Sequence, residues 1–257
     1  MRILYLAIEF VIDLLRRNVK RDSWLWNGLR GILNVLASLR HNPINKRRWE
    51  SNFNSFESII EQHSRETHDF FVLQIGACDG VMADPIHTWI KKYRWQGILV
   101  EPQREEFERL KINYRDNDNL GFENVAIAEH SGLRPLYKVK DENIEASWQR
   151  GVASLLPKPG LEKQDVVTTE MVQCVTFDTL LNRHQVKRID LLQIDVEGYD
   201  YELLKLFDFE GIKPQLIRYE HGHLTLSDRS ACSKYLTQNG YEILEMEYDT
   251  GAVLRRG

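Results

Sequence analysis

The sequence predicts an α/β fold, with a mostly parallel sheet, a C-terminal antiparallel hairpin and a helical extension at the N-terminus. Short, strongly apolar runs are typical of strands that are buried on both faces of a parallel sheet. Such runs occupy residues 70–75, 96–100 and 189–194. Segments with helical character follow these runs, so strands alternate with helices along the chain.

The first strand, residues 70–75, has Gln74 as its single polar interruption and ends in a loop from Gly76 to Gly80. Two glycines at the carboxyl end of a strand let the backbone bend sharply and approach a ligand. Asp84 suits a helix N-cap and Pro85 suits a first helical position, which predicts a helix that starts at Pro85. Ligands bind at such strand–loop–helix junctions in open α/β sheets.

The same signals predict the other elements. We expect helices at 53–63, 103–116 and 199–208, and strands at 122–128, 133–139 and 215–221. Ser227 and Asp228 can cap a further helix that ends at Asn239 and Gly240. Strands at 241–247 and 252–254 flank a predicted turn at 249–251, which forms the C-terminal hairpin.

Residues 140–173 lose regular periodicity and contain Pro157, Pro159 and Gly160. A loop of this length in a compact domain is often a lid or a substrate loop. We therefore predict that residues 140–173 select the substrate within a domain of residues 66–257. The alternative is a mobile excursion without such a role.

Residues 1–65 are predicted to form a basic, helical extension. Residues 1–50 hold 10 Lys and Arg against 4 Asp and Glu, whereas the whole chain has a net charge of −4. The apolar run at 3–15 is too short to span a bilayer. Its amphipathic pattern fits a helix packed on its own domain or on a second copy of the chain, and also fits a helix on a membrane surface. Tryptophan and basic residues, including Lys46 to Trp49, are frequent at lipid interfaces, so membrane contact is also expected.

The body of the protein is acidic, which argues against nucleic acid as a partner. The three cysteines, Cys78, Cys174 and Cys232, are widely scattered and match neither a disulfide framework nor a zinc motif. We therefore expect a cytoplasmic protein.

The glycine loop is compatible with two kinds of ligand, a dinucleotide and S-adenosylmethionine. Glu101 follows the second strand, where an acid binds ribose hydroxyls in both cases. A dinucleotide loop needs glycine where this chain has Cys78, because the backbone must approach a pyrophosphate. S-adenosylmethionine has no pyrophosphate, and its positive charges suit the carboxylates of Asp79, Asp84 and Asp195. Glu101 as a surface acid and Asp79 as a turn cap stay open as alternatives.

Six blocks of the chain resemble one known family. They are LQIGACDGVMADPIH (73–87), GILVEPQ (97–103), NVAIAEHSG (124–132), VTFDTLL (175–181), IDLLQIDVEGYDYELL (189–204) and YEHGHL (219–224). Together and in this order they resemble the FkbM family of S-adenosylmethionine-dependent methyltransferases. The resemblance covers about residues 70–250 and leaves out residues 1–65.

The resemblance implies a class I methyltransferase fold, which is Rossmann-like, and O-methylation of a hydroxyl on a sugar, a glycan or a secondary metabolite. It implies cofactor contacts at the glycine loop and the second strand, with two residues near the adenine end. The expected cofactor residues are Gly76, Ala77, Asp79, Gly80, Asp84, Glu101, Pro102, Asn124, Ala126 and Asp195. Cys78 departs from the family, which often has Asn at this position.

A sugar hydroxyl is a weak nucleophile, so methyl transfer to it gains from a general base or a metal ion. We expect these groups at strand ends that face the pocket. The candidates for catalysis are Glu197, Glu220, His221 and His87, with His223 as a further possible base. Asp195, Glu197 and Glu220 are a candidate Mg²⁺ site, because Mg²⁺ prefers oxygen ligands.

Three functions are therefore compared. The first is S-adenosylmethionine-dependent O-methylation of a small molecule or a glycan. The second is a nicotinamide-dependent oxidoreductase, which Cys78 disfavours. The third is a membrane-docked binding protein that keeps the fold without catalysis.

Overall fold

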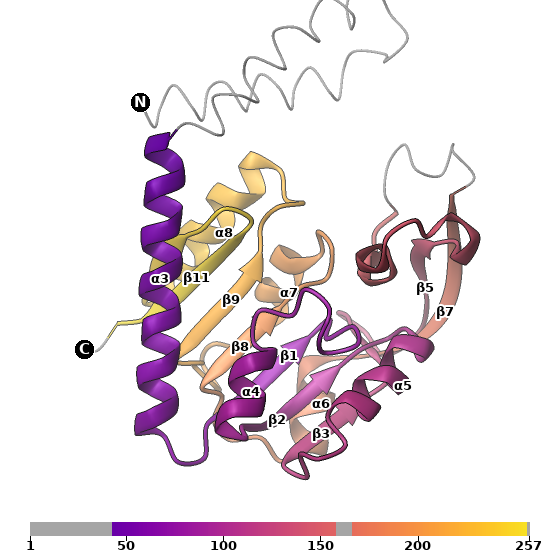
Figure 1. Cartoon of the computed structure of the whole chain (residues 1–257), viewed down its shortest axis with the longest axis horizontal. Coiled ribbons are helices and arrows are strands. Elements are labelled where there is room, and N and C mark those ends of the chain that lie inside the picture. The colour runs from indigo at the N-terminus through magenta and orange to yellow at the C-terminus, as the bar shows by residue number, and fades with distance from the viewer. Residues whose placement is uncertain (1–42, 158–165, 256–257) are drawn as a thin grey trace, which may run out of the picture.

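The computed structural model describes residues 43–157 and 166–255, whose strands form a seven-stranded sheet and a four-stranded sheet (Figure 1). The larger sheet has the order β10-β11-β9-β8-β1-β2-β3. Its strands are β1 Phe71–Ile75, β2 Gln96–Val100, β3 Leu120–Glu123, β8 Leu191–Ile194, β9 Leu216–Glu220, β10 Tyr241–Glu245 and β11 Asp249–Leu254. Strands β9, β8, β1, β2 and β3 are parallel, and β11 is antiparallel to both of its neighbours. The predicted mostly parallel sheet with a C-terminal antiparallel hairpin is confirmed.

Helices cover both faces of this sheet, which is why its central strands are almost continuously apolar. The helices are α3 Pro43–Glu66, α4 His87–Tyr93, α5 Arg104–Asn113, α6 Phe177–Arg183, α7 Asp200–Leu206 and α8 Leu226–Gln238. Leu73 and Leu192 pack with residues of α6, α7 and α8. Val72 and Leu191 pack on the opposite face, with residues of α3, α4 and α5.

The smaller sheet was not predicted. It has the order β4-β7-β5-β6 and consists of β4 Ala126–Ile127, β5 Gly132–Val139, β6 Ala153–Ser154 and β7 Val167–Val175. The strand expected at 122–128 is in fact two strands, since β3 belongs to the large sheet and β4 to the small one. The chain changes sheets at Asn124 and Val125, and a continuous apolar pattern does not reveal such a change.

The prediction that residues 140–173 are irregular is wrong for several segments. Two 3-10 helices, η1 Asp141–Asn143 and η2 Ser147–Gly151, precede β6, and β7 begins at Val167. Strand β7 pairs antiparallel with β5 over eight residue pairs, from Gly132 opposite Cys174 to Val139 opposite Val167. This pairing joins distant segments, so local periodicity did not indicate it.

Three predicted boundaries are also corrected. Asp84 Oδ1 accepts a hydrogen bond from the Ile86 amide at 2.9 Å, so Pro85 lies in a turn and α4 starts at His87. Thr225, rather than Ser227, caps α8, because its hydroxyl accepts from the Asp228 amide at 3.1 Å. The hairpin turn lies at residues 246–248, and residues 249–251 belong to β11, which pairs with β9.

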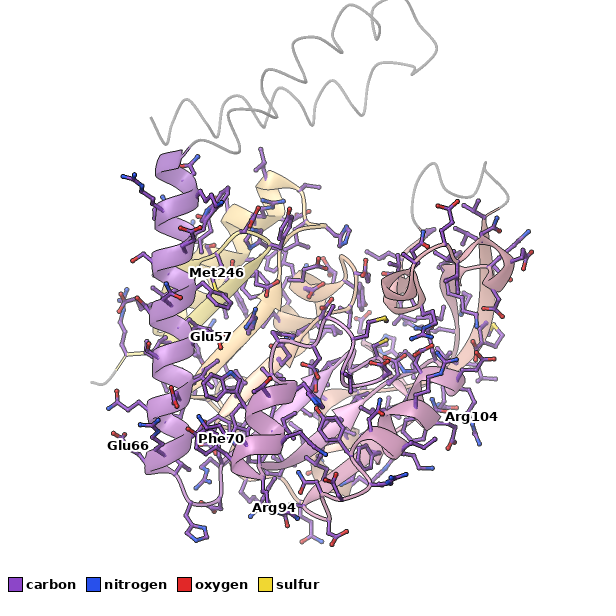
Figure 2. All side chains as sticks on the ribbon, viewed as in Figure 1. Glu57, Glu66, Phe70, Arg94, Arg104 and Met246 are labelled. Carbon is purple, nitrogen blue, oxygen red and sulfur yellow. The ribbon has the colours of Figure 1, made fainter. Side chains whose placement is uncertain are left out.

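Helix α3 is longer than the predicted 53–63 and packs against the large sheet. Phe56 and Ile60 are fully buried in the same cluster as Met246. Gly251 of β11 leaves space for the Phe56 ring, because a Cβ at Gly251 would lie 2.5 Å from that ring. Figure 2 shows Glu57 and Met246 along the boundary between α3 and the sheet. The predicted domain boundary at residues 65 and 66 therefore falls at the end of a helix whose own core contacts are with the sheet.

A buried ion-pair network fixes α3 in place. The Arg218 guanidinium donates to Glu57 Oε1 at 3.0 Å and to Asp249 Oδ2 at 2.8 Å. The indole of Trp89 donates to the other oxygen of Glu57 at 2.9 Å. Because Arg218 is buried, loss of one partner would leave an uncompensated charge inside the protein.

The predicted apolar helix at 3–15 and most of the basic extension lie outside the described residues. Within the described part of that extension, Trp49 is buried and Arg48 donates to Glu245 at 2.9 Å. Among the residues that the structure describes, none of the helices is both long and apolar enough to cross a lipid bilayer.

Replacing Phe56 with Ala is expected to lower the free energy of unfolding by about 3–5 kcal/mol, because it opens a cavity between α3 and the sheet. Urea unfolding followed by circular dichroism measures this change. The control is Phe53→Ala on the same helix, where Phe53 is 41% exposed and the expected loss is about 1 kcal/mol or less. Equal losses in the two variants would show that α3 does not depend on this contact.

Candidate functional site

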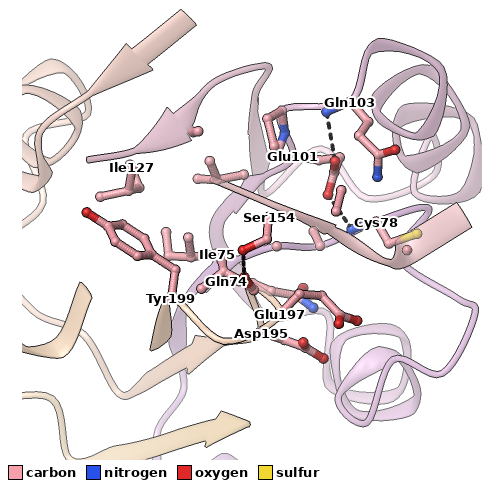
Figure 3. A pocket seen from close by; sticks show the side chains of 18 of the residues that line it. Gln74, Ile75, Cys78, Glu101, Gln103, Ile127, Ser154, Asp195, Glu197 and Tyr199 are labelled. Carbon is pink, nitrogen blue, oxygen red and sulfur yellow. Dashed lines mark hydrogen bonds between the residues drawn. The ribbon is translucent and has the colours of Figure 1, made fainter. Parts of the chain in front are cut away.

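A pocket of about 230 Å³ lies at the carboxyl ends of β1, β2, β8 and β9 (Figure 3). This is the edge at which open α/β sheets bind ligands. Of the predicted cofactor and catalytic residues, those that line the pocket are Gly76, Ala77, Asp84, Glu101, Pro102, Ala126, Asp195, Glu197 and Glu220. The opposite wall comes from the small sheet, which contributes Ala153 and Ser154, and from Gly151 at the end of η2.

Gly76 allows the ends of β1 and β8 to approach closely. Its φ angle is +82°, and a Cβ at this position would lie 1.8 Å from the carbonyl oxygen of Asp195. Gly80, with φ of +73°, instead allows α5 to pack closely against the loop, since a Cβ there would lie 2.5 Å from Leu110 and from Tyr114. Both glycines therefore accommodate neighbouring protein atoms, and of the two only Gly76 lines the pocket.

Glu101 is held in the pocket wall by two backbone amides. Its carboxylate accepts hydrogen bonds from the amides of Cys78 and Gln103, both at 2.8 Å, as the dashed lines in Figure 3 show. The side chain is 3% exposed, and this burial raises the pKa of Glu101 to about 7, although the two amides favour the charged form. A fixed, buried carboxylate of this kind can accept hydrogen bonds from ligand hydroxyls.

Asp79 and Asp84 have different environments within the loop. Asp79 Oδ1 accepts from the amides of Val81 and Met82, at 3.0 and 2.7 Å, and the residue does not line the pocket. These bonds match the turn-cap alternative for Asp79. Asp84 does line the pocket, and burial raises its pKa to about 6.

Acidic side chains gather at one end of the pocket. Asp195 and Glu197 follow β8, and Glu220 ends β9. Burial, followed by repulsion from neighbouring carboxylates, raises the pKa of Asp195 to about 7 and that of Glu220 to about 10. His223 Nε2 lies 3.0 Å from Glu197 Oε2 and 3.5 Å from Glu220 Oε1. This end of the pocket therefore favours cations and can accept a proton.

The other end of the pocket is apolar. Tyr199 and Ile127 lie together away from Asp195 and Glu197 in Figure 3. The lining residues of this kind are Val125, Ile127, Leu136, Tyr199 and Leu203. Such a surface suits a flat, apolar ring.

Several predicted site residues contact the protein outside the pocket lining. His87 Nδ1 lies 2.7 Å from the Gly80 carbonyl oxygen. His221 is buried, with Nδ1 2.9 Å from the Thr250 hydroxyl. The Asn124 amide donates to the carbonyls of Glu101 and Pro102, both at 2.9 Å, and so supports the loop that carries Glu101.

The segment that closes the pocket lies within residues 140–173, which the sequence predicts as a substrate loop, but no motif marked the individual residues that line the pocket. The Ser154 hydroxyl donates to the Val196 carbonyl at 3.2 Å, which ties β6 to the turn after β8. Gln103 donates from its side-chain amide to the Arg150 carbonyl at 2.9 Å. The Arg150 guanidinium also lies 3.5 Å from Glu106, so η2 is attached to the helix after β2.

Comparisons with known proteins identify the family of the domain that carries this pocket. The Methyltransferase FkbM domain matches residues 74–243, more than half of the chain. The chain belongs to the FkbM methyltransferase family. Membership of this family, with the observed sheet, makes the fold that of a class I methyltransferase and implies S-adenosylmethionine as the methyl donor.

Solved structures were also compared with this FkbM-family chain. A methyltransferase FkbM from Methylobacillus flagellatus KT is 13% identical, with a TM-score of 0.46 over 73% of this chain. The match spans 43% of that protein's length. The METTL16 MTase domain is 11% identical, with a TM-score of 0.43 over 79% of this chain and 66% of that one. A search of curated proteins finds no significant match.

Replacing Asp79 with Ala tests whether this residue is a turn cap. Loss of its two amide hydrogen bonds is expected to lower the free energy of unfolding by about 1–2 kcal/mol. The dissociation constant for S-adenosylhomocysteine, measured by calorimetry, is expected to change by about threefold or less. Asp79→Asn keeps the accepting oxygen and is the control. A large loss of affinity in both variants at normal stability would instead place Asp79 at the cofactor.

Proposed function

We propose that this protein is an S-adenosylmethionine-dependent O-methyltransferase whose acceptor is a hydroxyl on a sugar, a glycan or a small metabolite. The observation that carries the proposal is one pocket that joins Glu101, at the end of β2, to the acidic group of Asp195, Glu197 and Glu220. The first feature suits the ribose of the cofactor. The second suits removal of a proton from an acceptor hydroxyl.

The pocket residues fit the chemistry of the cofactor. The carboxylate of Glu101 would accept from the ribose hydroxyls, and the apolar end near Tyr199 would hold the adenine ring. Asp84 and Asp195 would face the positive charges of the methionine part. When bound, S-adenosylmethionine supplies a methyl group on a positively charged sulfur.

The acidic end has the groups needed to activate a hydroxyl. We propose that Glu197 lies nearest the acceptor and that, when no metal ion is bound to its carboxylate, it takes the proton directly or through His223, which lies 3.0 Å away. Glu220 has a pKa of about 10 and is therefore protonated at neutral pH when no cation is near. A cation in the pocket would lower the pKa values of these carboxyl groups and so keep them ionised at neutral pH, the state that can accept a proton.

Membership of the FkbM family favours methyl transfer over hydride transfer with a nicotinamide cofactor. We further propose a small-molecule or glycan acceptor rather than nucleic acid. The cytoplasmic location stays a prediction. Membrane contact or dimer formation through the N-terminal helix also stays a prediction, because that helix lies outside the described residues.

The proposal is tested by incubating the full chain with S-adenosylmethionine that carries a labelled methyl group. The acceptor panel contains monosaccharides, uronic acids, polyols and phenols, with amines as a contrast. Label on a hydroxyl oxygen is the expected result. Absence of binding of S-adenosylmethionine and S-adenosylhomocysteine at millimolar concentration would refute the proposal, and binding without transfer to any extract would favour the non-catalytic alternative.

The affinity for S-adenosylhomocysteine is expected to depend on pH through Glu101. The charged carboxylate accepts stronger hydrogen bonds than the protonated form, so affinity should fall as pH drops below the pKa of about 7. We expect a loss of about tenfold between pH 8 and pH 5.5. Calorimetry across this range measures it.

Glu101→Gln is the decisive variant for this dependence. It should bind weakly at pH 8 and lose the part of the pH dependence that Glu101 contributes, because the amide does not titrate in this range. Asp84 and Asp195, whose pKa values of about 6 and about 7 lie in the same range, account for the remainder. Glu105→Gln, at an exposed position on α5, is the control and should behave like the wild type. A full pH dependence in Glu101→Gln would contradict the role of Glu101.

A further inference from the structure

Three potential metal ligands converge beside the pocket, at the ends of β8 and β9. One oxygen each of Glu197 and Glu220, and one ring nitrogen of His223, all lie within 4.8 Å of one another. The His223 nitrogen is 3.0 Å from Glu197 Oε2 and 3.5 Å from Glu220 Oε1. Neighbouring ligands of an octahedral ion with bonds of about 2.1 Å lie about 3 Å apart, so the two separations from His223 are close to those of metal ligands.

Buried polar atoms without partners give a second indication. Glu220 Oε2 is buried and has no hydrogen-bond partner. The same holds for Oε1 of Gln74 and Oε1 of Gln193, whose residues are 2% and 3% exposed. The two glutamines are opposite each other in the pairing of β1 and β8, and both line the pocket that Glu197 and Glu220 line. Gln193 lies in β8, two residues before Asp195, which follows the end of that strand. These buried acceptors are available to a group bound in this part of the pocket.

The charge balance favours a cation as the bound group. A fourth carboxyl group, that of Asp200, lies near Asp195, Glu197 and Glu220. Asp200 is fully buried and accepts hydrogen bonds from the amides of Gly198 and Glu220. The nearby Arg218 is already engaged by Glu57 and Asp249. Several carboxylates in a shielded site repel one another unless a cation compensates them.

We propose that Glu197, Glu220 and His223 bind a divalent transition-metal ion such as Mn²⁺ or Zn²⁺. The imidazole distinguishes this site from the predicted Mg²⁺ site of Asp195, Glu197 and Glu220. Mg²⁺ prefers oxygen ligands, whereas an imidazole with two carboxylates suits Mn²⁺, Fe²⁺ or Zn²⁺.

Three protein ligands leave coordination positions open on the ion. Glu197 and Glu220 line the pocket, and the His223 side chain is 49% exposed. The open positions are therefore available to water or to oxygens of the acceptor, and neighbouring hydroxyls of a sugar are the chemical class that could occupy two of them. This acceptor role rests on the proposed function, whereas metal binding does not.

The site is tested on the full chain after treatment with a chelator, without cofactor or acceptor. Mn²⁺ is titrated by calorimetry and by electron paramagnetic resonance, and Zn²⁺ is then used as a competitor. We expect one bound Mn²⁺ per chain, with nitrogen coupling from His223 in the pulsed spectrum. Absence of binding of both ions at 1 mM, a concentration far above the affinity expected of about micromolar, would overturn the proposal.

The variants separate ligation from folding. His223→Ala should remove the nitrogen coupling, and both His223→Ala and Glu220→Gln should weaken Mn²⁺ binding by about a hundredfold or more. The matched control is His130→Ala, because His130 is an exposed histidine 3.8 Å from a single carboxylate, that of Glu129. Each variant is checked by its affinity for S-adenosylhomocysteine, which reports the folded pocket. Unchanged Mn²⁺ binding in His223→Ala and Glu220→Gln would show that His223 is simply a counter-ion of the two glutamates.

The two proposals fail in different ways. A chain that binds Mn²⁺ through His223 but binds neither S-adenosylmethionine nor S-adenosylhomocysteine would retain the metal site and refute the proposed O-methyltransferase function. A chain that methylates a hydroxyl, binds no metal and is insensitive to chelators would support the proposed function and refute the metal site.

Discussion

The close approach of β1 and β8 at Gly76 is the constraint on which the pocket depends. A side chain at this position would collide with the Asp195 carbonyl, and the positive φ angle would be strained for any other residue. With glycine there, the loop after β1 turns toward β2, and the Cys78 amide reaches the carboxylate of Glu101. The same contact brings the turn after β8, with Asp195 and Glu197, to the pocket. One backbone contact thus positions both the cofactor residues and the acidic residues.

The electrostatic environment differs between the Glu101 side of the pocket and the side that carries Asp195 and Glu220. Glu101 is buried, but two backbone amides donate hydrogen bonds to its carboxylate and favour the charged form. Burial, and then repulsion from neighbouring carboxylates, raises the pKa values of Asp195 and Glu220. A cationic methyl donor and a metal ion would both supply compensating positive charge. The pKa values of the acidic residues are therefore expected to depend on what the pocket contains, which couples binding to proton removal.

The parallel strands were predictable because burial on both faces demands a local, almost continuous apolar run, as in β1 and β8. The small sheet was not predictable from the sequence, since β7 has mixed burial and its partner β5 is distant in sequence. The division of residues 122–128 between two sheets depends on a change of direction at Asn124, whose amide bonds to Glu101 and Pro102. Pairing partners and such changes are properties of the assembled chain, and residue periodicity does not contain them.

The sequence by itself determined that Gly76, Glu101, Asp195 and Glu220 meet at one edge, because the carboxyl ends of parallel strands point in the same direction. Only the tertiary structure decided which neighbouring side chains share the pocket. His223 contacts Glu197 and Glu220, whereas His221 bonds to Thr250 and His87 to Gly80. Beyond a strand end, the direction of a side chain follows the turn geometry, such as the φ of +58° at Glu197, and the packing of distant elements. Neither of these is encoded in the spacing of the residues.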